Sequence, residues 1–254
     1  MTVSKELSAQ LTTRLKELYL PAIRECYHEQ AETARLESYS YEQYLLELAQ
    51  RECENRRQNR IDRFLRESKL PLEKTLQSFN RKRLPHKIDA QLSVLLDGSF
   101  LDRCENILAF GNPGSGKTHL LCAIGRELIH NGKRVLYVPC SLLVQNLLIA
   151  KRDLKLPQTL KKLGKYDALI IDDIGYVQQS RQEMEVLFTL LADRYERSSV
   201  MITSNLPFSQ WEHIFKDPMT TAAAIDRLVH HSIILELNLS SYRLEQSQKQ
   251  QDKG

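Results

Sequence analysis

A glycine-rich run, GNPGSGKT at positions 111–118, constrains the fold of this chain more than any other feature of its sequence. Glycine reaches positive φ without strain, so Gly111, Gly114 and Gly116 let the backbone turn sharply and approach a ligand closely. The run follows an apolar segment at 107–110 and precedes an apolar helical pattern. This setting predicts a strand, a phosphate-binding loop and a helix, with the loop N–H groups directed at phosphate.

The loop also carries the side chains that a bound nucleoside triphosphate requires. We expect Lys117 to place a cation beside the β and γ phosphates and Thr118 to supply a hydroxyl ligand for Mg²⁺. A glycine turn that binds nothing is the alternative, and the strand-loop-helix setting argues against it. ATP and Mg²⁺ are therefore the expected cofactors. The predicted loop contacts are Gly111, Asn112, Pro113, Gly114, Ser115, Gly116, Lys117 and Thr118.

Two carboxylates follow a second apolar run, at 168–171. A buried strand places the residues at its carboxyl end in the crevice where α/β proteins bind ligands, beside the loop. We expect Asp172 to hold Mg²⁺, directly or through water, and Asp173 to polarise the water that attacks the phosphate. The alternative is that both carboxylates only cap the loop before Gly175.

A third polar residue, Asn205, follows the apolar run 200–203. Its amide is placed to hydrogen-bond the γ-phosphate or the attacking water, but Asn is equally common as a turn residue, so both interpretations stay open. Two isolated arginines occur later, Arg227 and Arg243. By residue type alone, isolated arginines are mostly surface ion-pair partners.

The fold class follows from the alternation of short apolar runs with helical patterns. The apolar runs lack alternation between polar and apolar residues, which is typical of a parallel sheet covered on both faces. We therefore predict an α/β fold with a central parallel sheet flanked by helices. The expected strands are 106–110, 134–138, 168–171, 200–203 and 232–237, and the expected helices are 117–131, 141–163 and 182–198.

The chain before this alternation has a different character. Residues 6–67 contain no glycine, one proline and many good helix formers, which predicts a small all-α domain over 1–67. Ser40 is a candidate N-cap for a helix that runs to about residue 65. Prolines break the segment 68–98, which we interpret as a linker flanking the nucleotide. The nucleotide-binding domain is expected over 99–244, and the polar tail 245–254 is expected to be disordered.

Charge and cysteine content exclude several classes of function. The net charge of +4 does not decide a partner, but basic residues gather at 51–87 and again at 151–165, and both clusters are candidate polyanion-binding surfaces. No apolar run approaches the roughly 20 residues of a membrane span and the N-terminus lacks a secretory signal, so we expect a cytoplasmic protein without membrane contact. The five cysteines form no Cys-x-x-Cys pair, which argues against zinc or a disulfide framework.

In these motifs the chain resembles the AAA+ ATPases, within them the group of bacterial initiators and helicase loaders, and most closely the IstB family. That family consists of ATP-binding helpers encoded beside the transposase of one class of insertion sequence. The resemblance covers nearly the whole chain and implies a P-loop NTPase fold with a DnaC-like AAA+ core. It rests on residues 111–119, 169–175, 203–207 and 225–228 and on the upstream segment from Arg60 to Phe79.

The resemblance also implies roles for particular residues. It extends the nucleotide contacts to His119 and places Asn205 at the position that senses the γ-phosphate. Arg227 matches an arginine that reaches into the ATP site of a neighbouring subunit, which implies a homo-oligomer with composite sites. Arg243 lies near a second sensing arginine. Many AAA+ proteins carry Asp-Glu where this chain has two aspartates, so the carboxylate at Asp173 is one methylene shorter.

By the same resemblance, the helical element at 141–164 faces the channel in which nucleic acid runs. The expected contacts with DNA phosphates are Lys151, Arg152, Lys155, Lys161 and Lys162. Such contacts carry little sequence information and make binding dependent on salt. The alternative is a solvated lysine face on an ordinary surface helix.

The implied function is an ATPase that oligomerises on duplex DNA, helps a DDE-type transposase to select its target and contacts it through the N-terminal helices. A replicative helicase loader is the first alternative, because it shares the ATPase core and differs in its partner. A scaffold in which ATP binding acts without hydrolysis is the second. The partner of the N-terminal domain and the release of phosphate would discriminate between these functions.

Overall fold

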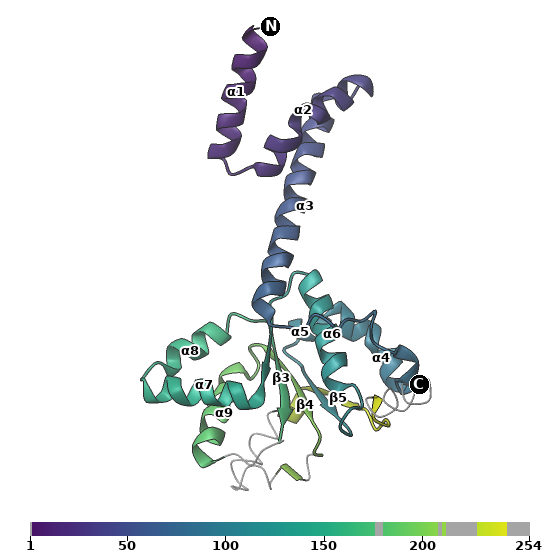
Figure 1. The fold of residues 1–254 in the computed structure, drawn as a ribbon, viewed down its shortest axis with the longest axis vertical. Coiled ribbons are helices and arrows are strands. Elements are labelled where there is room, and N and C mark those ends of the chain that lie inside the picture. The colour runs from purple at the N-terminus through teal and green to yellow at the C-terminus, as the bar shows by residue number, and fades with distance from the viewer. Residues whose placement is uncertain (1, 176–179, 208–209, 212–227, 243–254) are drawn as a thin grey trace, which may run out of the picture. The chain divides into compact units, whose positions relative to one another are not determined.

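The computed structural model describes residues 2–175, 180–207, 210–211 and 228–242 (Figure 1). The chain divides into two compact units, an N-terminal unit, Met1–Arg63, and a C-terminal unit, Phe64–Gly254. The division after Arg63 falls inside helix α3 (Tyr41–Ser68). The domain boundary expected from the sequence, after residue 67, lies in the same helix. Within the described ranges, no helix is both long enough and apolar enough to cross a membrane.

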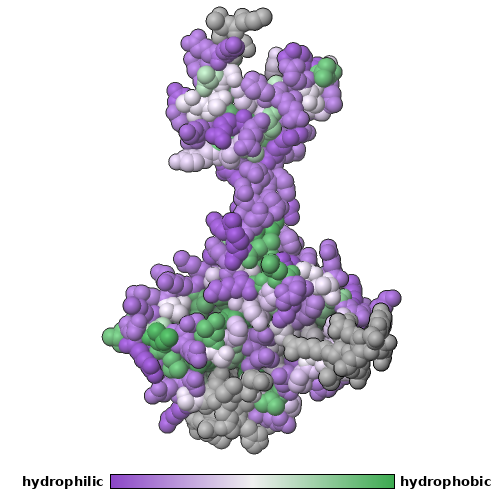
Figure 2. Space-filling view, viewed as in Figure 1, coloured by the Kyte–Doolittle hydropathy of each residue, from purple (hydrophilic) through white to green (hydrophobic). Residues whose placement is uncertain are grey.

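The N-terminal unit consists of α1 (Thr2–Glu17), α2 (Pro21–Leu36) and the first part of α3. Its core is small and is formed by Leu15, Tyr27 and Leu48, one from each helix. The predicted cap of α3 is confirmed, because the Ser40 hydroxyl accepts a hydrogen bond from the Gln43 N–H at 3.2 Å. Figure 2 shows a mainly hydrophilic surface over these helices, with scattered apolar side chains.

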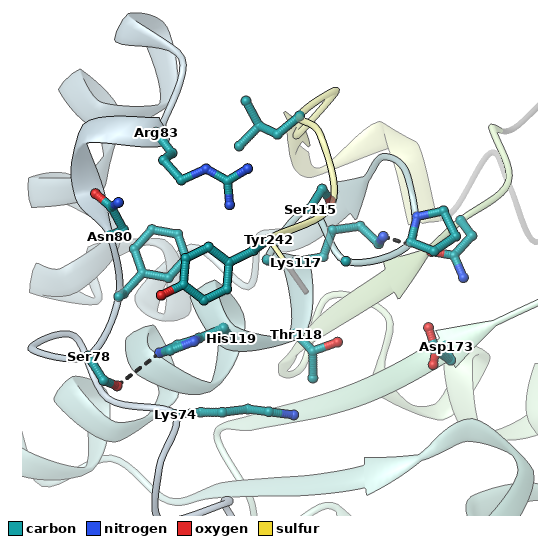
Figure 3. A pocket seen from close by; sticks show the side chains of 16 residues that line it. Lys74, Ser78, Asn80, Arg83, Ser115, Lys117, Thr118, His119, Asp173 and Tyr242 are labelled. Atoms are coloured by element: carbon teal, nitrogen blue, oxygen red, sulfur yellow. Dashed lines mark hydrogen bonds between the residues drawn. The ribbon is translucent and has the colours of Figure 1, made fainter. Parts of the chain in front are cut away.

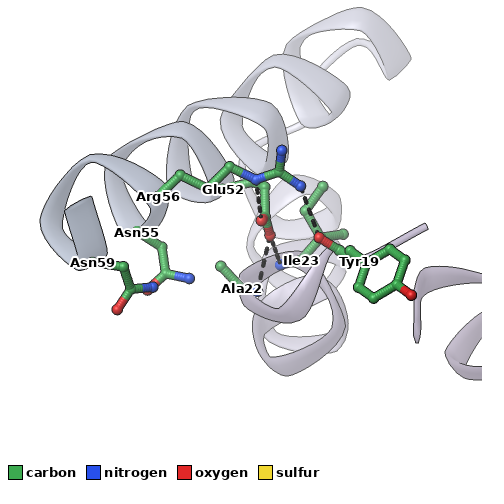
Figure 4. Close-up of polar contacts among 7 residues, drawn as sticks. All are labelled: Tyr19, Ala22, Ile23, Glu52, Asn55, Arg56 and Asn59. Atoms are coloured by element: carbon green, nitrogen blue, oxygen red, sulfur yellow. Dashed lines mark hydrogen bonds and ion pairs between the residues drawn. The ribbon is translucent and has the colours of Figure 1, made fainter. Parts of the chain in front are cut away.

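A buried glutamate caps the start of helix α2 in the N-terminal unit (Figure 4). Pro21 starts α2 and no side chain of the preceding turn caps this helix. Instead, Glu52 of α3 accepts hydrogen bonds from the N–H groups of Ala22 at 2.9 Å and Ile23 at 3.3 Å. Arg56 pairs with Glu52 at 2.9 Å and also donates to the Tyr19 carbonyl at 2.7 Å. The start of α2 is thus satisfied by a carboxylate at the positive end of its dipole.

The C-terminal unit is built on a parallel sheet, as predicted. Among the described residues, five strands pair in the order β2-β3-β4-β1-β5, and every pairing is parallel. The strands are β1 (Asn106–Phe110), β2 (Val135–Pro139), β3 (Ala168–Ile174), β4 (Ser199–Ser204) and β5 (Ser232–Glu236). The carboxyl ends of β1, β3 and β4 therefore meet at one edge of the sheet.

Helices cover both faces of this sheet (Figure 1). Leu108 and Ile171 pack with residues of the helices on one face, whereas Ile170 points to Gly125 in the helix on the other. A Cβ at Gly125 would lie 2.7 Å from the Ile170 side chain, so glycine allows this close packing. The first face carries α7 (Cys140–Arg152) and α9 (Arg181–Arg194), and the second carries α6 (Lys117–His130), on which α4 (His86–Asp97) packs. Two short helices, η1 (Arg81–Arg83) and α5 (Ser99–Asp102), lie before β1.

One predicted element is wrong. The sequence favours a single helix over 141–163, but the structure has two, α7 and α8 (Leu156–Leu163). Leu154 adopts a left-handed φ of 59°, which ends α7, and Pro157 occupies the first turn of α8, where its missing N–H costs no hydrogen bond. A continuous helix would have placed this proline in its interior.

Candidate nucleotide site

The loop between β1 and α6 folds back over the start of α6. Gly111 and Gly114 have φ values of 146° and 77°. A Cβ at Gly111 would lie 2.1 Å from the Leu237 carbonyl oxygen, and one at Gly114 would lie 2.3 Å from the Ser241 hydroxyl. Both the backbone conformation and the available space therefore require glycine.

Lys117 is the buried cation of the site. Its ammonium donates to the carbonyls of Gly111 at 2.8 Å and Asn112 at 2.9 Å, and to Oδ1 of Asn205 at 2.7 Å. Burial lowers the pKa of Lys117, while the carboxylates of Asp173 and Asp172 act in the opposite direction. The loop lysine and the asparagine after β4, which lie far apart in the sequence, are thus in direct contact.

Asp172 is held by hydroxyl groups from three neighbouring elements. Thr118 of α6 and Thr203 of β4 both donate to Oδ1, at 2.7 and 2.6 Å. Tyr137 of β2 donates to Oδ2 at 2.8 Å. Burial, followed by the hydrogen bond to Asp172, raises the pKa of Tyr137.

Asp173 is exposed, whereas its neighbour Asp172 is buried. It has a left-handed φ of 60°, and the register between β3 and β4 shifts between Ile171 and Ile174. The Asp173 N–H donates to the Thr203 hydroxyl at 2.8 Å, which stabilises this conformation. A non-glycine residue in the left-handed region is uncommon, and here the bulge brings a second carboxylate to the edge of the sheet where Asp172 lies.

A cavity of about 330 Å³ opens beside these groups (Figure 3). One part of its wall is formed by the loop, Asp173 and Asn205. The other part comes from outside the sheet, from residues before β1 and after β5. This second part includes Lys74, Phe79, Arg83 and Tyr242. The volume is within the range of small-molecule sites.

Phe79 and His119 form the aromatic part of the cavity wall. Their rings meet edge to face with centroids 5.1 Å apart. Nε2 of His119 lies 2.9 Å from the Thr75 carbonyl and 3.2 Å from the Ser78 hydroxyl, which anchors the upstream segment to α6. A Cβ at Gly116 would lie 3.3 Å from the Phe79 ring, so this ring packs directly against the loop.

The segment after β5 is tied to the same cavity. Arg83 donates to the Ser240 carbonyl at 2.8 Å, and its guanidinium lies 5.2 Å from the centroid of the Tyr242 ring. The Tyr242 N–H donates to the Gly114 carbonyl at 3.0 Å. An upstream segment and a downstream segment therefore close over the loop together.

The donor groups fit a magnesium ion that arrives with a nucleotide. Within the described ranges, no group of three or more His, Cys, Asp or Glu residues is arranged to hold a metal by itself. Mg²⁺ bound with a nucleotide needs only one or two protein oxygen ligands besides the phosphates and waters, and Thr118 with Asp172 would provide them. The hydroxyl of Ser115 is buried and has no hydrogen-bond partner in the described part of the chain. An unpartnered hydroxyl inside the loop is consistent with an oxygen-rich ligand.

The structure brings most predicted site residues together. Lys117, Thr118, Asp173, Asn205 and the other predicted loop residues lie around or beside the cavity, with Asp172 one hydrogen bond away from Thr118. His119 faces the upstream segment. Three predictions, Arg227, Arg243 and the tail 245–254, lie outside the described residues.

The predicted DNA-contacting residues lie on α7, on α8 and in the turn between them, and all five are exposed. Lys151 forms an ion pair with Glu185 of α9 at 2.8 Å, and Lys155 lies 3.7 Å from Asp153. Within the described chain, Arg152, Lys161 and Lys162 have no ion pair. These three side chains are therefore the ones available to an external anion.

Sequence reasoning missed several residues of the site. Tyr137 contacts Asp172, and the signal that could have found it is its place near the carboxyl end of β2, where Pro139 pairs in register with Asp172. Phe79, Arg83 and Tyr242 line the cavity itself. No local pattern assigns them to the cavity, since their contacts depend on how distant segments fold together.

A family model described as "IstB-like ATP binding protein" matches residues 13–250. A putative insertion sequence ATP-binding protein of Sinorhizobium fredii is 45% identical over 236 residues, which cover 92% of this chain and 79% of that protein. The Insertion sequence IS21 putative ATP-binding protein of Pseudomonas aeruginosa is 36% identical, covering 94% of this chain and 89% of that protein.

Solved structures share the fold at lower identity. DnaI matches with a TM-score of 0.56 and 22% identity, covering 66% of this chain and 95% of the DnaI chain. AMPPCP-bound DnaA from Aquifex aeolicus matches with a TM-score of 0.56 and 19% identity, covering 73% of this chain and 57% of the DnaA chain. These matches show that the chain shares its fold with DnaI and with the matched part of DnaA.

Proposed function

Because the chain belongs to the family of IstB-like ATP-binding proteins, we propose that it is a Mg²⁺-dependent ATPase that assembles on duplex DNA and assists the transposase of an insertion sequence. The observation that carries the catalytic part is the convergence of three strand ends on one cavity. Lys117 contacts Asn205 there, and Thr118 contacts Asp172. Asp172 belongs to β3 and Asn205 follows β4, so these two pairs join the loop to two further strands of the sheet at the place where a triphosphate would lie.

The chemistry assigned to these residues is phosphoryl transfer to water. The loop N–H groups and the Lys117 ammonium bind the β and γ phosphates. Thr118 and Asp172 would hold Mg²⁺, which adds positive charge beside the phosphates when bound. Asp173 is exposed at the cavity and orients the attacking water through its carboxylate. Asn205 hydrogen-bonds the γ-phosphate. Together with Lys117, which it contacts, it distinguishes ATP from ADP.

The nucleotide base occupies the other part of the cavity in this proposal. Phe79, His119 and Tyr242 offer aromatic surface there, and aromatic rings stack on nucleobases. We call this group, together with Arg83, the base side of the cavity. The phosphate side comprises Lys117, Thr118, Asp172, Asp173 and Asn205.

Duplex DNA is the proposed partner of α7 and α8. Arg152, Lys161 and Lys162 are exposed and have no ion pair in the described part of the chain, so their charge is available to DNA phosphates. Helix α7 begins directly after β2, whose last residue pairs with Asp172, and it runs for 13 residues, which is about 20 Å. It therefore joins the nucleotide site to Arg152, the residue of the proposed DNA surface that lies on α7, through one rigid element.

Fluorescence anisotropy of a labelled duplex tests the proposal. We expect strong binding with a nonhydrolysable ATP analogue and weak binding with ADP, since the γ-phosphate drives assembly. Equal affinity in the two states contradicts the proposal. The double variant Lys161→Gln with Lys162→Gln is expected to reduce the slope of log K against log salt by about 0.9 for each DNA phosphate that these lysines neutralise. Lys5→Gln with Lys16→Gln is the control, because it changes the net charge equally on exposed residues of the N-terminal unit.

Assembly and partner complete the proposal. Arg227 completes the ATP site of a neighbouring subunit, so the ATP analogue is expected to produce oligomers with the wild-type chain, and Arg227→Ala is expected to form them without turnover. The N-terminal unit is expected to retain the cognate transposase in a pull-down. Relatives that span nearly the whole chain are insertion-sequence proteins, whereas the likeness to DnaI rests on fold, so we favour a transposase over a helicase. Retention of a helicase instead would reverse this choice.

A further inference from the structure

Tyr137 occupies a position at the nucleotide site to which the proposed chemistry gives no role. It lies on β2, two residues before the strand ends, and its side chain is half-buried. Its hydroxyl donates to Oδ2 of Asp172 across the neighbouring strand at 2.8 Å. The phenol does not line the cavity itself, so it acts on the site through the carboxylate.

The three hydrogen bonds to Asp172 are distributed unevenly. Thr118 and Thr203 both donate to Oδ1, at 2.7 and 2.6 Å, and these two bonds use the lone pairs of that oxygen. Rotation of the carboxylate about its Cβ–Cγ bond would move both oxygens away from their donors, so a hydrogen bond on the second oxygen adds to the resistance against this rotation. Within the described residues, Tyr137 provides the hydrogen bond on that second oxygen, and it therefore helps to hold the plane of the carboxylate.

The plane of Asp172 determines the direction of the Thr118 hydroxyl. While Thr118 donates its proton to Asp172, its oxygen lone pairs point away from the carboxylate and are available to a metal ion. A rotated carboxylate would weaken this donation and let the hydroxyl turn. Hydrogen-bond partners of this kind orient the groups that ligate metals, and their loss typically reduces metal affinity about 10- to 100-fold.

We propose that Tyr137 is a positioning residue for magnesium. Tyr137 holds Asp172 so that the Thr118 hydroxyl presents its lone pairs to a Mg²⁺ ion bound with the nucleotide. This inference rests on the proposed function, because it requires Mg²⁺ with ATP at the phosphate side. It concerns the coupling between the metal and the nucleotide and not the affinity for nucleotide alone.

The Tyr137 ring has a separate contact, which determines the choice of variant. The ammonium of Lys74, which lines the cavity, lies over this ring at 5.9 Å from its centroid. Tyr137→Phe keeps the ring and its packing and removes only the hydroxyl that reaches Asp172. A matched control is Tyr166→Phe, because Tyr166 is also half-buried and carries a cation over its ring, the Arg134 guanidinium at 5.0 Å. The Tyr166 hydroxyl has no hydrogen-bond partner among the described residues.

The experiment measures the affinity of the full chain for a fluorescent ATP analogue, once with Mg²⁺ and once with EDTA. The ratio of the two affinities reports how strongly metal and nucleotide bind together. We expect Tyr137→Phe to reduce this ratio about tenfold while leaving the affinity in EDTA unchanged. The Tyr166→Phe variant is expected to keep the wild-type ratio.

Three results would overturn the inference. A wild-type ratio in Tyr137→Phe means that the phenol does not position the metal site. An equal loss of affinity with and without Mg²⁺, with a lower melting temperature, means that the hydroxyl only supports the fold. If the wild-type chain itself does not bind the analogue, the proposed function fails and the inference fails with it, whereas the first two results leave the proposed function intact.

Discussion

The phosphate side and the base side of the cavity are built in different ways. The phosphate side comes from residues at the carboxyl ends of β1, β3 and β4 and the start of α6, and short hydrogen bonds connect them, such as Thr203 to Asp172 at 2.6 Å. The base side comes mainly from segments before β1 and after β5, and these meet α6 through ring contacts such as that of Phe79 with His119, whose ring centroids lie 5.1 Å apart. One side is fixed by the sheet, and the other depends on how the ends of the domain fold over it.

We therefore expect substitutions on the two sides to differ in their energetic cost and in their effect on nucleotide specificity. Groups held by charged hydrogen bonds in a buried site interact strongly with the developing charge of a reaction. Aromatic contacts contribute about 0.5–1.5 kcal/mol each and tolerate some movement. Changes at the phosphate side should therefore remove activity, whereas changes at the base side should shift affinity and the preference for adenine.

The largest effect is expected for Lys117→Ala. This change removes the cation that contacts Asn205 and the loop carbonyls, so phosphate release should fall about 1000-fold. A phosphate-release assay in the presence of duplex DNA measures the effect. Lys87→Ala on α4 is the control, since Lys87 is exposed and does not line the cavity. Turnover near the wild-type rate in Lys117→Ala would break the distinction between the two sides.

Asp173→Asn should separate hydrolysis from binding. The amide keeps the size of the side chain but cannot take up a proton, so turnover should fall about 100-fold while ATP affinity stays nearly unchanged. Phosphate release and equilibrium binding, measured on the same variant, check both parts. If wild-type chains also release no phosphate, with or without DNA, the chain acts as a scaffold that responds to ATP binding without hydrolysis.

Phe79→Ala should have a moderate effect. Loss of the ring that packs between the loop and His119 is expected to weaken ATP binding about tenfold and to reduce the preference for ATP over GTP. Tripolyphosphate, which has no base, should compete equally well in this variant and in the wild-type chain. Weaker competition by tripolyphosphate would mean that Phe79 supports the loop and does not contact the base.

The smallest effect is expected for Arg83→Gln. This variant loses the cation over the Tyr242 ring, and an exposed contact of this kind is worth about 0.5–1 kcal/mol, so ATP affinity should fall about threefold. Competition binding with ATP measures the change. A reduction as large as that of Lys117→Ala would show that the segment after β5 controls the phosphate side, and the two sides could then not be treated separately.

The same contrast explains what the sequence could predict. The phosphate side could be predicted from the sequence, because a parallel sheet places the residues that follow its strands at one edge. Lys117, Asp172 and Asn205 could therefore be expected together from local patterns. Tyr137 escaped because a tyrosine in an apolar run is easily interpreted as part of the core. The roles of these residues in catalysis remain predictions, and so does the contribution of Arg227.

Long-range contacts account for the rest. Arg83 and Ser240 are 157 residues apart and Glu52 caps a helix 30 residues before it, and no window of sequence reports such distances. The break between α7 and α8 was missed for a different reason. Pro157 is visible in the sequence, but the surrounding residues keep a helical pattern that conceals the left-handed Leu154.

A crystal structure of the chain with Mg²⁺ and a nonhydrolysable ATP analogue tests the central claim most directly. The triphosphate is expected against the loop with Lys117 beside its γ-phosphate, the metal at the Thr118 hydroxyl, and the base next to Phe79. A nucleotide bound elsewhere, or a metal that contacts neither Thr118 nor Asp172 directly or through water, would contradict the proposed site.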